Sequence, residues 1–284
     1  MTISIDELEA AAADGWRAPE EAALGGWRLR AAGGFTGRAN SALASGDPGM
    51  PLAEAAGEVC RWYRARGLPP MIAIAFPAGA AQDSAVDRFL AARGWPVGHG
   101  AIVMTAAPQT LTAAAAAGEA GMNRVELDCV DPDRVDPDRV DLDRVDLDRV
   151  DLDPEPDEGW LALYRFQGGK PPPVSRRLLM SAPWQAFGSI REDGRAVAIG
   201  RVAAARGWAG LTAIEVDPAH RRRGLGGAIT GALVAAAVRR GVTGIYLQVA
   251  GGNEEARSLY RRAGFADHHE YHYRIAPEPA TAAG

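Results

Sequence analysis

The chain has 284 residues, of which 47% are hydrophobic and 24% are charged, and its formal net charge is −5. This length allows one or two domains with a substantial core, and this composition excludes a largely disordered chain. No apolar run reaches 18 residues, so the sequence predicts no membrane-spanning helix. Two cysteines cannot make a disulfide framework or a four-ligand zinc site, which favours free thiols in a cytoplasmic protein.

The negative charge comes from one repetitive segment. Residues 130–153 repeat a V-D-(P/L)-D-R unit and contain ten Asp and four Arg, a net charge of −6. The rest of the chain is therefore nearly neutral, which predicts no nucleic-acid partner and no membrane partner. Repulsion between regularly spaced Asp side chains favours a solvated loop over a β-helical coil. A calcium site is the other alternative, although the segment lacks the Gly and the final Glu of an EF-hand loop.

The first part of the chain, residues 1–107, predicts a small unit of helices and strands. Apolar residues at helical spacing, glycine stops and short apolar runs give these elements. In chain order we expect a helix at 3–16, a strand–turn–strand at 25–44, a helix at 52–67, a strand at 71–76, a helix at 85–95 and a strand at 100–107.

Residues 108–121 are small and repetitive and are interpreted as a linker to a second domain, 122–284, into which the repeat is inserted. Gly-containing turns at 192–194 and 206–207 predict two hairpins. The expected fold class is α+β in three layers, with two domains that each have a mostly antiparallel sheet flanked by helices. In chain order we expect a strand at 122–129, helices at 157–167 and 174–182, strands at 184–194, 195–207 and 208–217, a helix at 225–240, a strand at 244–250, a helix at 253–263 and a strand at 269–276.

One Gly-rich loop carries a candidate binding site. Residues 214–227 read IEVDPAHRRRGLGG: a strand ends, three arginines and three glycines follow, and a helix begins. Glycines allow close approach of the backbone, and the free N–H groups at a helix start attract anions. The loop therefore predicts a diphosphate site. The alternative is a basic turn without a ligand, because the spacing matches neither the dinucleotide fingerprint nor the P-loop.

A second segment makes the pattern specific. Residues 247–265, LQVAGGNEEARSLYRRAGF, follow the Gly-rich loop at the right distance, and together the two segments resemble the signatures of the GNAT N-acetyltransferases. The resemblance covers roughly residues 211–265. It implies transfer of an acyl group, usually acetyl, from coenzyme A to an amine, with acetyl-CoA as co-substrate and no metal.

The resemblance also implies roles for individual residues. Backbone groups at the end of one strand would hold the pantetheine arm and the thioester carbonyl, with the N–H of Val216 as the oxyanion donor. Amides of the Gly-rich loop would hold the pyrophosphate, and Tyr260 would protonate the departing thiolate. The implied cofactor-binding residues are Ile214, Glu215, Val216, Arg221, Arg222, Arg223, Gly224, Leu225, Gly226, Gly227, Asn253 and Tyr260.

The general base departs from the family pattern. Gln248 stands where ribosomal-protein N-terminal acetyltransferases of this family carry Glu, and a glutamine amide cannot act as a base. Glu215 is the candidate catalytic base, and an outward-facing strand carboxylate is the alternative; Gln248 is then a candidate acceptor-binding residue. Further options are Glu254, Glu255 and His220. The histidines His268, His269 and His272 favour a structural strand over a zinc site.

The first domain resembles the same fold without its coenzyme site. Its corresponding loop, residues 45–51 (SGDPGMP), has two glycines but an Asp and no Arg, so it should not hold a pyrophosphate. The stretches GFTGRANS and RWYRARGLPP resemble an actinobacterial tandem group whose members are linked to glutamate N-acetylation and protein lysine acetylation. Arg38, Asn40 and Ser41 are candidate acceptor-binding residues, with a hydrogen-bonded strand edge as the alternative.

The predicted function is an N-acetyltransferase with one active site, in the second domain. The acceptor is a primary amine of a small molecule, such as glutamate or an antibiotic-like amine, or of a protein. The alternatives are a catalytically weak acetyl-CoA sensor and a partner-binding role for the repeat. The sequence leaves both a monomer and a homodimer open.

Overall fold

The computed structural model describes residues 3–80, 84–111, 149–165 and 168–278. Within them the helices are α1 (Ile5–Gly15), α2 (Leu52–Arg64), α3 (Ala85–Ala91), α5 (Glu158–Leu163), α6 (Val174–Leu179), α7 (Leu225–Arg239) and α8 (Glu254–Arg262), with short 3-10 turns η1 (Gly37–Ala39) and η4 (Pro218–His220). The strands are β1 (Glu20–Leu24), β2 (Trp27–Ala31), β3 (Ala42–Leu43), β4 (Met71–Pro77), β5 (Val97–Ala106), β6 (Asp151–Asp153), β7 (Trp184–Glu192), β8 (Arg195–Ala205), β9 (Trp208–Val216), β10 (Gly244–Ala250) and β11 (Ala266–Ile275).

These strands form one sheet in the order β1-β2-β3-β4-β11-β5-β10-β9-β8-β7-β6. Its pairs are antiparallel except β3 with β4 and β9 with β10. The predicted α+β class with a mixed, mostly antiparallel sheet is confirmed. The two predicted domains, however, are not seen as two separate sheets.

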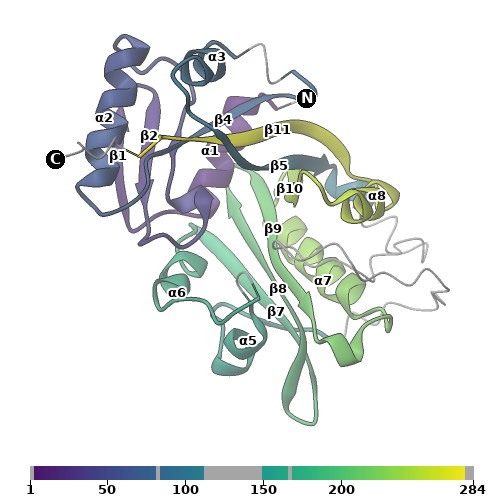
Figure 1. Cartoon of the computed structure of the whole chain (residues 1–284). Coiled ribbons are helices and arrows are strands. Elements are labelled where there is room, and N and C mark those ends of the chain that lie inside the picture. The colour runs from purple at the N-terminus through teal and green to yellow at the C-terminus, as the bar shows by residue number, and fades with distance from the viewer. Residues whose placement is uncertain (1–2, 81–83, 112–148, 166–167, 279–284) are drawn as a thin grey trace.

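The two halves of the chain exchange their last strands. β11, from the C-terminal end, lies between β4 and β5 of the first half, and Figure 1 shows this yellow strand among the blue strands. In return β5 lies against β10 of the second half, in register from Ala106 opposite Ile245 to Ala101 opposite Ala250. Each half therefore completes the centre of the sheet with a strand from the other.

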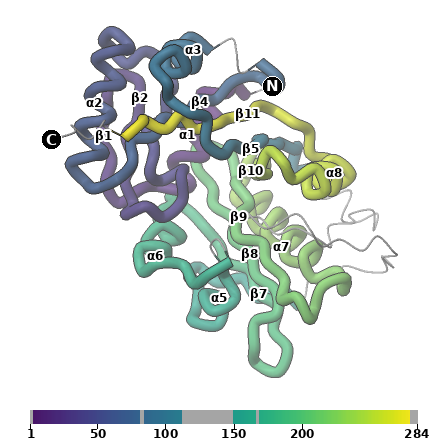
Figure 2. Tube along the Cα trace, viewed as in Figure 1, coloured from purple at the N-terminus to yellow at the C-terminus, as the bar shows by residue number. Residues whose placement is uncertain are grey.

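Helices cover both faces of the sheet (Figure 2). α7 packs against β7, β8 and β9 on one face, and α1 and α5 pack against β8 on the other. Side chains alternate accordingly along β8: Ala198 and Val202 join the core under α7, whereas Ile199 joins the core of α5 and α6. This period of two is the expected pattern for a strand buried on both faces.

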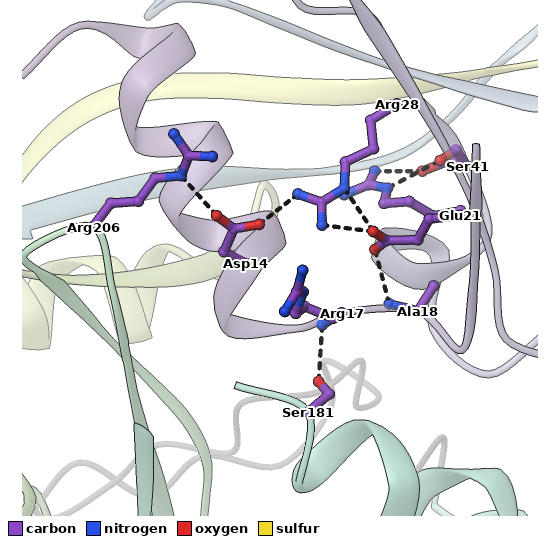
Figure 3. Close-up of polar contacts among 9 residues, drawn as sticks. Asp14, Arg17, Ala18, Glu21, Arg28, Ser41, Ser181 and Arg206 are labelled. Atoms are coloured by element: carbon purple, nitrogen blue, oxygen red, sulfur yellow. Dashed lines mark hydrogen bonds and ion pairs between the residues drawn. The ribbon is translucent and has the colours of Figure 1, made fainter. Parts of the chain in front are cut away.

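Helix α1 connects the halves through its C-terminal end (Figure 3). The Asp14 carboxylate accepts a hydrogen bond from Arg28 of β2 and one from Arg206 of the β8–β9 turn, both at 2.7 Å. The N–H of Arg17 donates to Oγ of Ser181 at 2.9 Å. Burial opposes ionisation of Asp14, but the hydrogen bonds from Arg206 and Arg28 outweigh it and lower the pKa of that carboxyl.

The hairpins and most other elements were predictable from local sequence. Asp193 and Gly194, and Arg206 and Gly207, have the consecutive positive φ values of the tight turns that suit hairpins. Two expectations in the first half were wrong in detail: β1 was not predicted, and most of the stretch predicted as a second strand within 25–44 forms a loop with η1, leaving only β3 extended.

The acidic repeat lies mostly outside the described residues, as do the strand expected at 122–129 and residues 112–121 of the expected linker. The last residues of the repeat are described and differ from the expectation of a loop. They form β6, which pairs antiparallel with β7 from Asp151 opposite Ser189 to Asp153 opposite Phe187.

Asp87 fixes the exchanged strand β11 to α3. Its carboxylate accepts from Nε and Nη2 of Arg274 at 2.7 and 2.8 Å and lies 2.6 Å from Nε2 of His272. Burial raises the pKa of Asp87, but the hydrogen bonds from Arg274 and His272 outweigh it and lower the pKa below its usual value. The folded state therefore favours the ionised carboxylate.

We expect Asp87→Asn to destabilise the protein by about 3 kcal/mol at pH 7, because it leaves the Arg274 guanidinium without its counter-charge. Because the pKa of Asp87 is lower in the folded than in the unfolded state, its contribution to the free energy of unfolding is complete above the ordinary Asp pKa of about 4. This contribution is lost as the pH falls through the lowered pKa of the folded state. Urea unfolding at pH 7 and at pH 3 should show the difference between wild type and variant shrinking, with the exposed Asp151→Asn as control. A difference that grows on acidification would contradict this assignment.

Candidate active site

The site begins where two neighbouring strands diverge. β9 and β10 pair in parallel only from Trp208 opposite Gly244 to Gly210 opposite Tyr246. A Cβ on Gly210 would lie 2.4 Å from the ring of Tyr246, so only glycine allows the strands to approach this closely at the last pair. Beyond it, no pairing joins the two strands within the described residues. Their C-terminal ends thus form a fork.

A β-bulge lies on the β9 side of the fork. The register of β9 against β8 shifts between Thr212 opposite Arg201 and Glu215 opposite Ile199, and Ala213 has φ of 54°. A non-glycine residue with positive φ costs about 1–3 kcal/mol, and such bulges commonly re-aim side chains beside functional sites. The apolar residues of this strand give no sign of a bulge, so the sequence analysis did not predict it.

The structure assigns the first three residues of the predicted Gly-rich loop, 214–216, to β9, so the loop is residues 217–227 and leads from the end of β9 into the first turn of α7. Its backbone is turned by Arg222, with φ of 62°, and by Gly224, with φ of 77°. Gly224 is the N-cap of α7 and makes no side-chain cap hydrogen bond, and Gly226 and Gly227 are buried in the first turn. In the described structure, the first amides of a 15-residue helix thus lack a side-chain acceptor, which suits an anion.

The arginines of this loop differ in their surroundings. Arg223 donates to both carboxylate oxygens of Glu192 on β7, at 2.6 and 3.1 Å, and this hydrogen bonding lowers the pKa of Glu192. His220 lies 3.2 Å from Asp217 and 3.5 Å from Glu192. Arg222 is exposed and Arg221 is half-buried. The structure therefore brings the predicted cations together beside the helix start, with Arg223 braced by the β7–β8 hairpin.

Glu215 and Gln248 carry polar groups at the two sides of the fork. The Glu215 carboxylate accepts from the N–H of Arg165, just beyond α5, at 2.9 Å. The Gln248 amide oxygen accepts from Nη1 of Arg38 at 2.8 Å and from the hydroxyl of Tyr271 at 3.2 Å. Arg38, a residue of the first half, thus reaches the strand that borders the fork in the second half.

Asn40 holds its own loop together. Its Oδ1 accepts from the N–H groups of Ala32 and Gly34 at 2.8 and 2.9 Å. Its Nδ2 donates to the carbonyls of Phe35 and Thr36 at 2.7 and 2.8 Å. These four bonds use the full capacity of the amide, which favours the structural alternative for this residue. Contact of Asn40 with an acceptor stays a prediction.

Tyr260 and Asn253 both have structural roles. Tyr260 is 1% exposed and packs edge-on against Phe265, with ring centroids 5.6 Å apart. Burial raises the pKa of Tyr260 far above its ordinary value, so the hydroxyl is protonated at neutral pH. Asn253 caps α8, its Oδ1 accepting from the N–H of Ala256 at 2.9 Å. Their contacts with coenzyme A stay predictions.

The histidines of β11 are tied into the fold. His269 is fully buried, with Nε2 2.9 Å from Glu9 and Nδ1 2.8 Å from Nδ1 of His268. His272 is bound to Asp87. Across the described ranges, no group of three His, Cys, Asp or Glu side chains is arranged to hold a metal ion. Nor does any helix in this part of the chain have the length and apolar character to cross a membrane.

Comparison with known proteins covers nearly the whole chain. The family model described as Probable histone acetyltransferase Rv0428c C-terminal matches residues 2–274. A curated relative, the uncharacterized N-acetyltransferase YobR of Bacillus subtilis (strain 168), is 27% identical over 275 residues, which is 95% of this chain and 98% of the relative.

Solved structures show the same fold. A GCN5-related N-acetyltransferase from Kribbella flavida aligns with a TM-score of 0.57 at 16% identity, covering 99% of this chain and 98% of that one. A tandem GNAT protein from the clavulanic acid biosynthesis pathway aligns with a TM-score of 0.55 at 14% identity, covering 84% of this chain and 76% of that one. The resemblance to the GNAT fold inferred from the sequence is confirmed.

Proposed function

We propose that this chain, which belongs to the Rv0428c C-terminal family and has the GNAT acetyltransferase fold, transfers an acetyl group from acetyl-CoA to a primary amine. The acceptor is either a small molecule, such as an amino acid or an antibiotic-like amine, or a protein. The family description names a protein acceptor, a histone. The observation that carries the proposal is the fork between β9 and β10 with the Gly-rich loop directly after β9.

The residues of the fork suit the two parts of acetyl-CoA. The uncapped start of α7, beside the loop arginines, provides N–H donors and positive charge for the diphosphate. The segment from Ile214 to Val216 has no strand pairing with β10 within the described residues, and we place the pantetheine arm along this side of it. The two features are neighbours along the chain, because the loop that ends β9 at Val216 leads directly into α7 at Leu225.

The chemistry requires two proton movements. The acceptor nitrogen forms a bond to the thioester carbonyl carbon and loses a proton to a base, for which we propose Glu215. The N–H of Val216 donates to the oxyanion that forms. When the carbon–sulfur bond breaks, the thiolate takes a proton, for which we propose the Tyr260 hydroxyl.

For the base, we expect Glu215→Gln to lower kcat by about a hundredfold, in line with the loss of a general base. The wild-type rate should fall at acidic pH as the carboxylate is protonated, and this limb should disappear in the variant. The control is Glu54→Gln, which removes an exposed carboxylate in the first turn of α2. A pH–rate profile that is the same in Glu215→Gln and wild type would exclude Glu215 as the base.

For the acid, we expect Tyr260→Phe to lower kcat by about tenfold while the affinity for acetyl-CoA changes little. Phe keeps the ring that packs against Phe265, so the melting temperature should be nearly unchanged. Tyr246→Phe, another buried tyrosine, whose pKa is raised to about 12 by burial, is the matched control. Equal turnover of Tyr260→Phe and wild type would remove Tyr260 from the mechanism.

The function as a whole is tested by thiol release from acetyl-CoA in a screen of amino acids, aminoglycosides and lysine peptides. We expect release that depends on one acceptor class and is lost in Glu215→Gln. Tight acetyl-CoA binding without release for any acceptor would instead support the sensor alternative. That alternative is favoured by one observation: Gln248 has no basic group and its oxygen is already held by Arg38 and Tyr271.

A further inference from the structure

Three ionisable side chains from the two halves of the chain form one hydrogen-bond network. Glu9 of α1 is 8% exposed, and its Oε1 lies 2.9 Å from Nε2 of His269, which is fully buried in β11. Nδ1 of His269 lies 2.8 Å from Nδ1 of His268, and Nε2 of His268 lies 3.0 Å from the carbonyl oxygen of Ile3. This Glu9–His269–His268 network thus runs from a buried carboxylate to a half-buried imidazole.

The carbonyl at the end of the network determines where its protons lie. A carbonyl oxygen only accepts, so Nε2 of His268 carries a proton. Burial lowers the pKa of His268, which favours the neutral ring and leaves its Nδ1 as an acceptor. Nδ1 of His269 therefore donates to His268, and one further proton lies between Nε2 of His269 and the Glu9 carboxylate. Each group is able to pass a proton to the next.

The carboxylate end of the network reaches a small cavity between the two halves. The cavity has a volume of about 10 Å³, roughly the room for one water molecule, and both Glu9 and Gln248 line it. Gln248 belongs to the part of β10 that does not pair with β9, so the cavity adjoins the site proposed for acetyl transfer. The Gln248 amide is able to orient a water molecule but not to take its proton, whereas a carboxylate does both.

The other titratable and charged groups around Glu9 are poor proton acceptors at neutral pH. The guanidinium groups of Arg30 and Arg38, which also line the cavity, have no acceptor atom. Burial raises the pKa values of the surrounding phenols, so these stay protonated: Tyr246, Tyr271 and Tyr273. Among the described residues that line the cavity, Glu9 is therefore the group that is able to accept a proton.

Acetyl transfer to a primary amine releases one proton in total. At neutral pH the acceptor in solution is an ammonium ion, and its nitrogen has no lone pair for attack until one N–H bond breaks. After attack the nitrogen loses a second proton, the one that Glu215 takes, and the thiolate receives one from Tyr260. The proton on Glu215 is able to restore Tyr260 between turnovers. The first proton needs an acceptor of its own.

We propose that the Glu9–His269–His268 network takes this first proton from the acceptor ammonium and carries it to solvent. The inference rests on the proposed acetyl transfer. One N–H bond of the ammonium breaks, its electron pair stays on nitrogen, and the proton passes to a water molecule in the cavity, which gives one of its own protons to Glu9. Nε2 of His269 then binds a proton from Glu9 while Nδ1 releases one to His268, which loses it to solvent. A carboxylate of the first half thereby does what Gln248 cannot do.

The test compares two acceptor probes of similar size. Ethylamine is an ammonium ion at pH 7, whereas the fluorines of trifluoroethylamine keep its nitrogen mostly neutral. Thiol release from acetyl-CoA by the full chain is measured with each probe in wild type and in Glu9→Gln, which keeps the size of the side chain and its capacity for hydrogen bonds. We expect kcat/KM to fall about a hundredfold with ethylamine and less than about threefold with trifluoroethylamine.

Two further variants serve as matched controls. Glu9→Asp should keep part of the rate with ethylamine, because it keeps the carboxylate, and the remote Glu54→Gln should leave the rates with both amines unchanged. Melting temperatures verify that each variant is folded. At pH 10 the difference between Glu9→Gln and wild type should narrow, because more of the ethylamine is then neutral in solution.

The proposal is overturned if Glu9→Gln slows both amines by the same factor, as expected of a purely structural link between α1 and β11, or if it slows neither. His268→Gln, at the half-buried end, should show the same selective loss with ethylamine, and equal effects on both amines would again contradict the network. Nitrogen NMR of the isotope-labelled chain gives a readout without turnover: Nδ1 should be protonated in His269 and unprotonated in His268, and the reverse would overturn the proposal. No thiol release by wild type with either amine would count against acetyl transfer itself, whereas transfer that is indifferent to Glu9 removes the network alone.

Discussion

Gly224→Asp is expected to abolish acetyl-CoA binding, with an affinity at least a hundredfold below that of wild type, whereas Gly224→Asn, whose side chain competes for the same amides without adding charge, should retain measurable binding. Gly224 has φ of 77° and is the N-cap of α7. Asn and Asp are the non-glycine residues that best tolerate this conformation, and both are good N-caps. The two variants therefore share size and helix capping and differ in one negative charge beside the proposed diphosphate.

The measurement is calorimetric titration of each variant with acetyl-CoA at low ionic strength, with melting temperatures to verify folding. Loss of binding in Gly224→Asp together with retention in Gly224→Asn would locate the diphosphate at the start of α7. Equal affinity in both variants would contradict that location. Equal loss in both would point to a steric requirement for glycine, as expected for backbone that approaches a ligand closely.

The second large effect is expected from dividing the chain. Neither fragment 1–121 nor fragment 122–284 should fold alone, because each lacks a central strand that the other provides. In fragment 1–121, β4 and β5 would lose β11, which pairs with both of them, and with it the buried side chains of Tyr271 and Tyr273. In fragment 122–284, β10 would lose its antiparallel partner β5. A sheet opened at its centre exposes two apolar edges and does not retain a packed core.

Calorimetry of the separate fragments should show no cooperative unfolding transition, and co-expression of the two should restore a single transition and acetyl-CoA binding. The uncut chain is the control. A sharp transition in either fragment alone would contradict the exchange of strands, and it would support two domains with the boundaries expected from the sequence.

Local signals in the sequence were sufficient to predict the secondary-structure elements that position the site. The turn residues at 192–194 and 206–207 predicted the two hairpins, and the Gly-rich stretch before Leu225 predicted the start of α7. These features depend on residues within a few positions of one another, so a single sequence contains them.

The exchange of β5 and β11 was not predictable in the same way. Their apolar residues indicate burial, but an apolar pattern does not say which strand lies alongside, and here the partners are more than 130 residues apart along the chain. Two sequence features, by contrast, were overlooked. Arg30 in WRLRA and Arg201 in RAVAIGRVAAA each have non-polar residues on both sides in a mostly apolar strand, and a cation at such a position signals a buried polar site.

The first half offers a contrast to the proposed coenzyme site. In its corresponding loop Asp47 stands two residues before Gly49, whose N–H donates to the Asp47 carboxylate at 2.8 Å, and the carbonyl of Asp47 accepts from the N–H of Gly26. The loop is thus packed on the β1–β2 turn and carries a negative charge. An anionic diphosphate would meet this negative charge and no arginine of the loop, and the absence of a coenzyme site in this half stays a prediction.

The stoichiometry of acetyl-CoA binding tests the central claim most directly. Calorimetric titration of the wild-type chain should give one acetyl-CoA per chain, because the fork and the Gly-rich loop occur together in the second half alone within the described structure. We expect a dissociation constant of about micromolar order, the range in which enzymes commonly hold such substrates. Two molecules per chain, or no binding, would contradict the account.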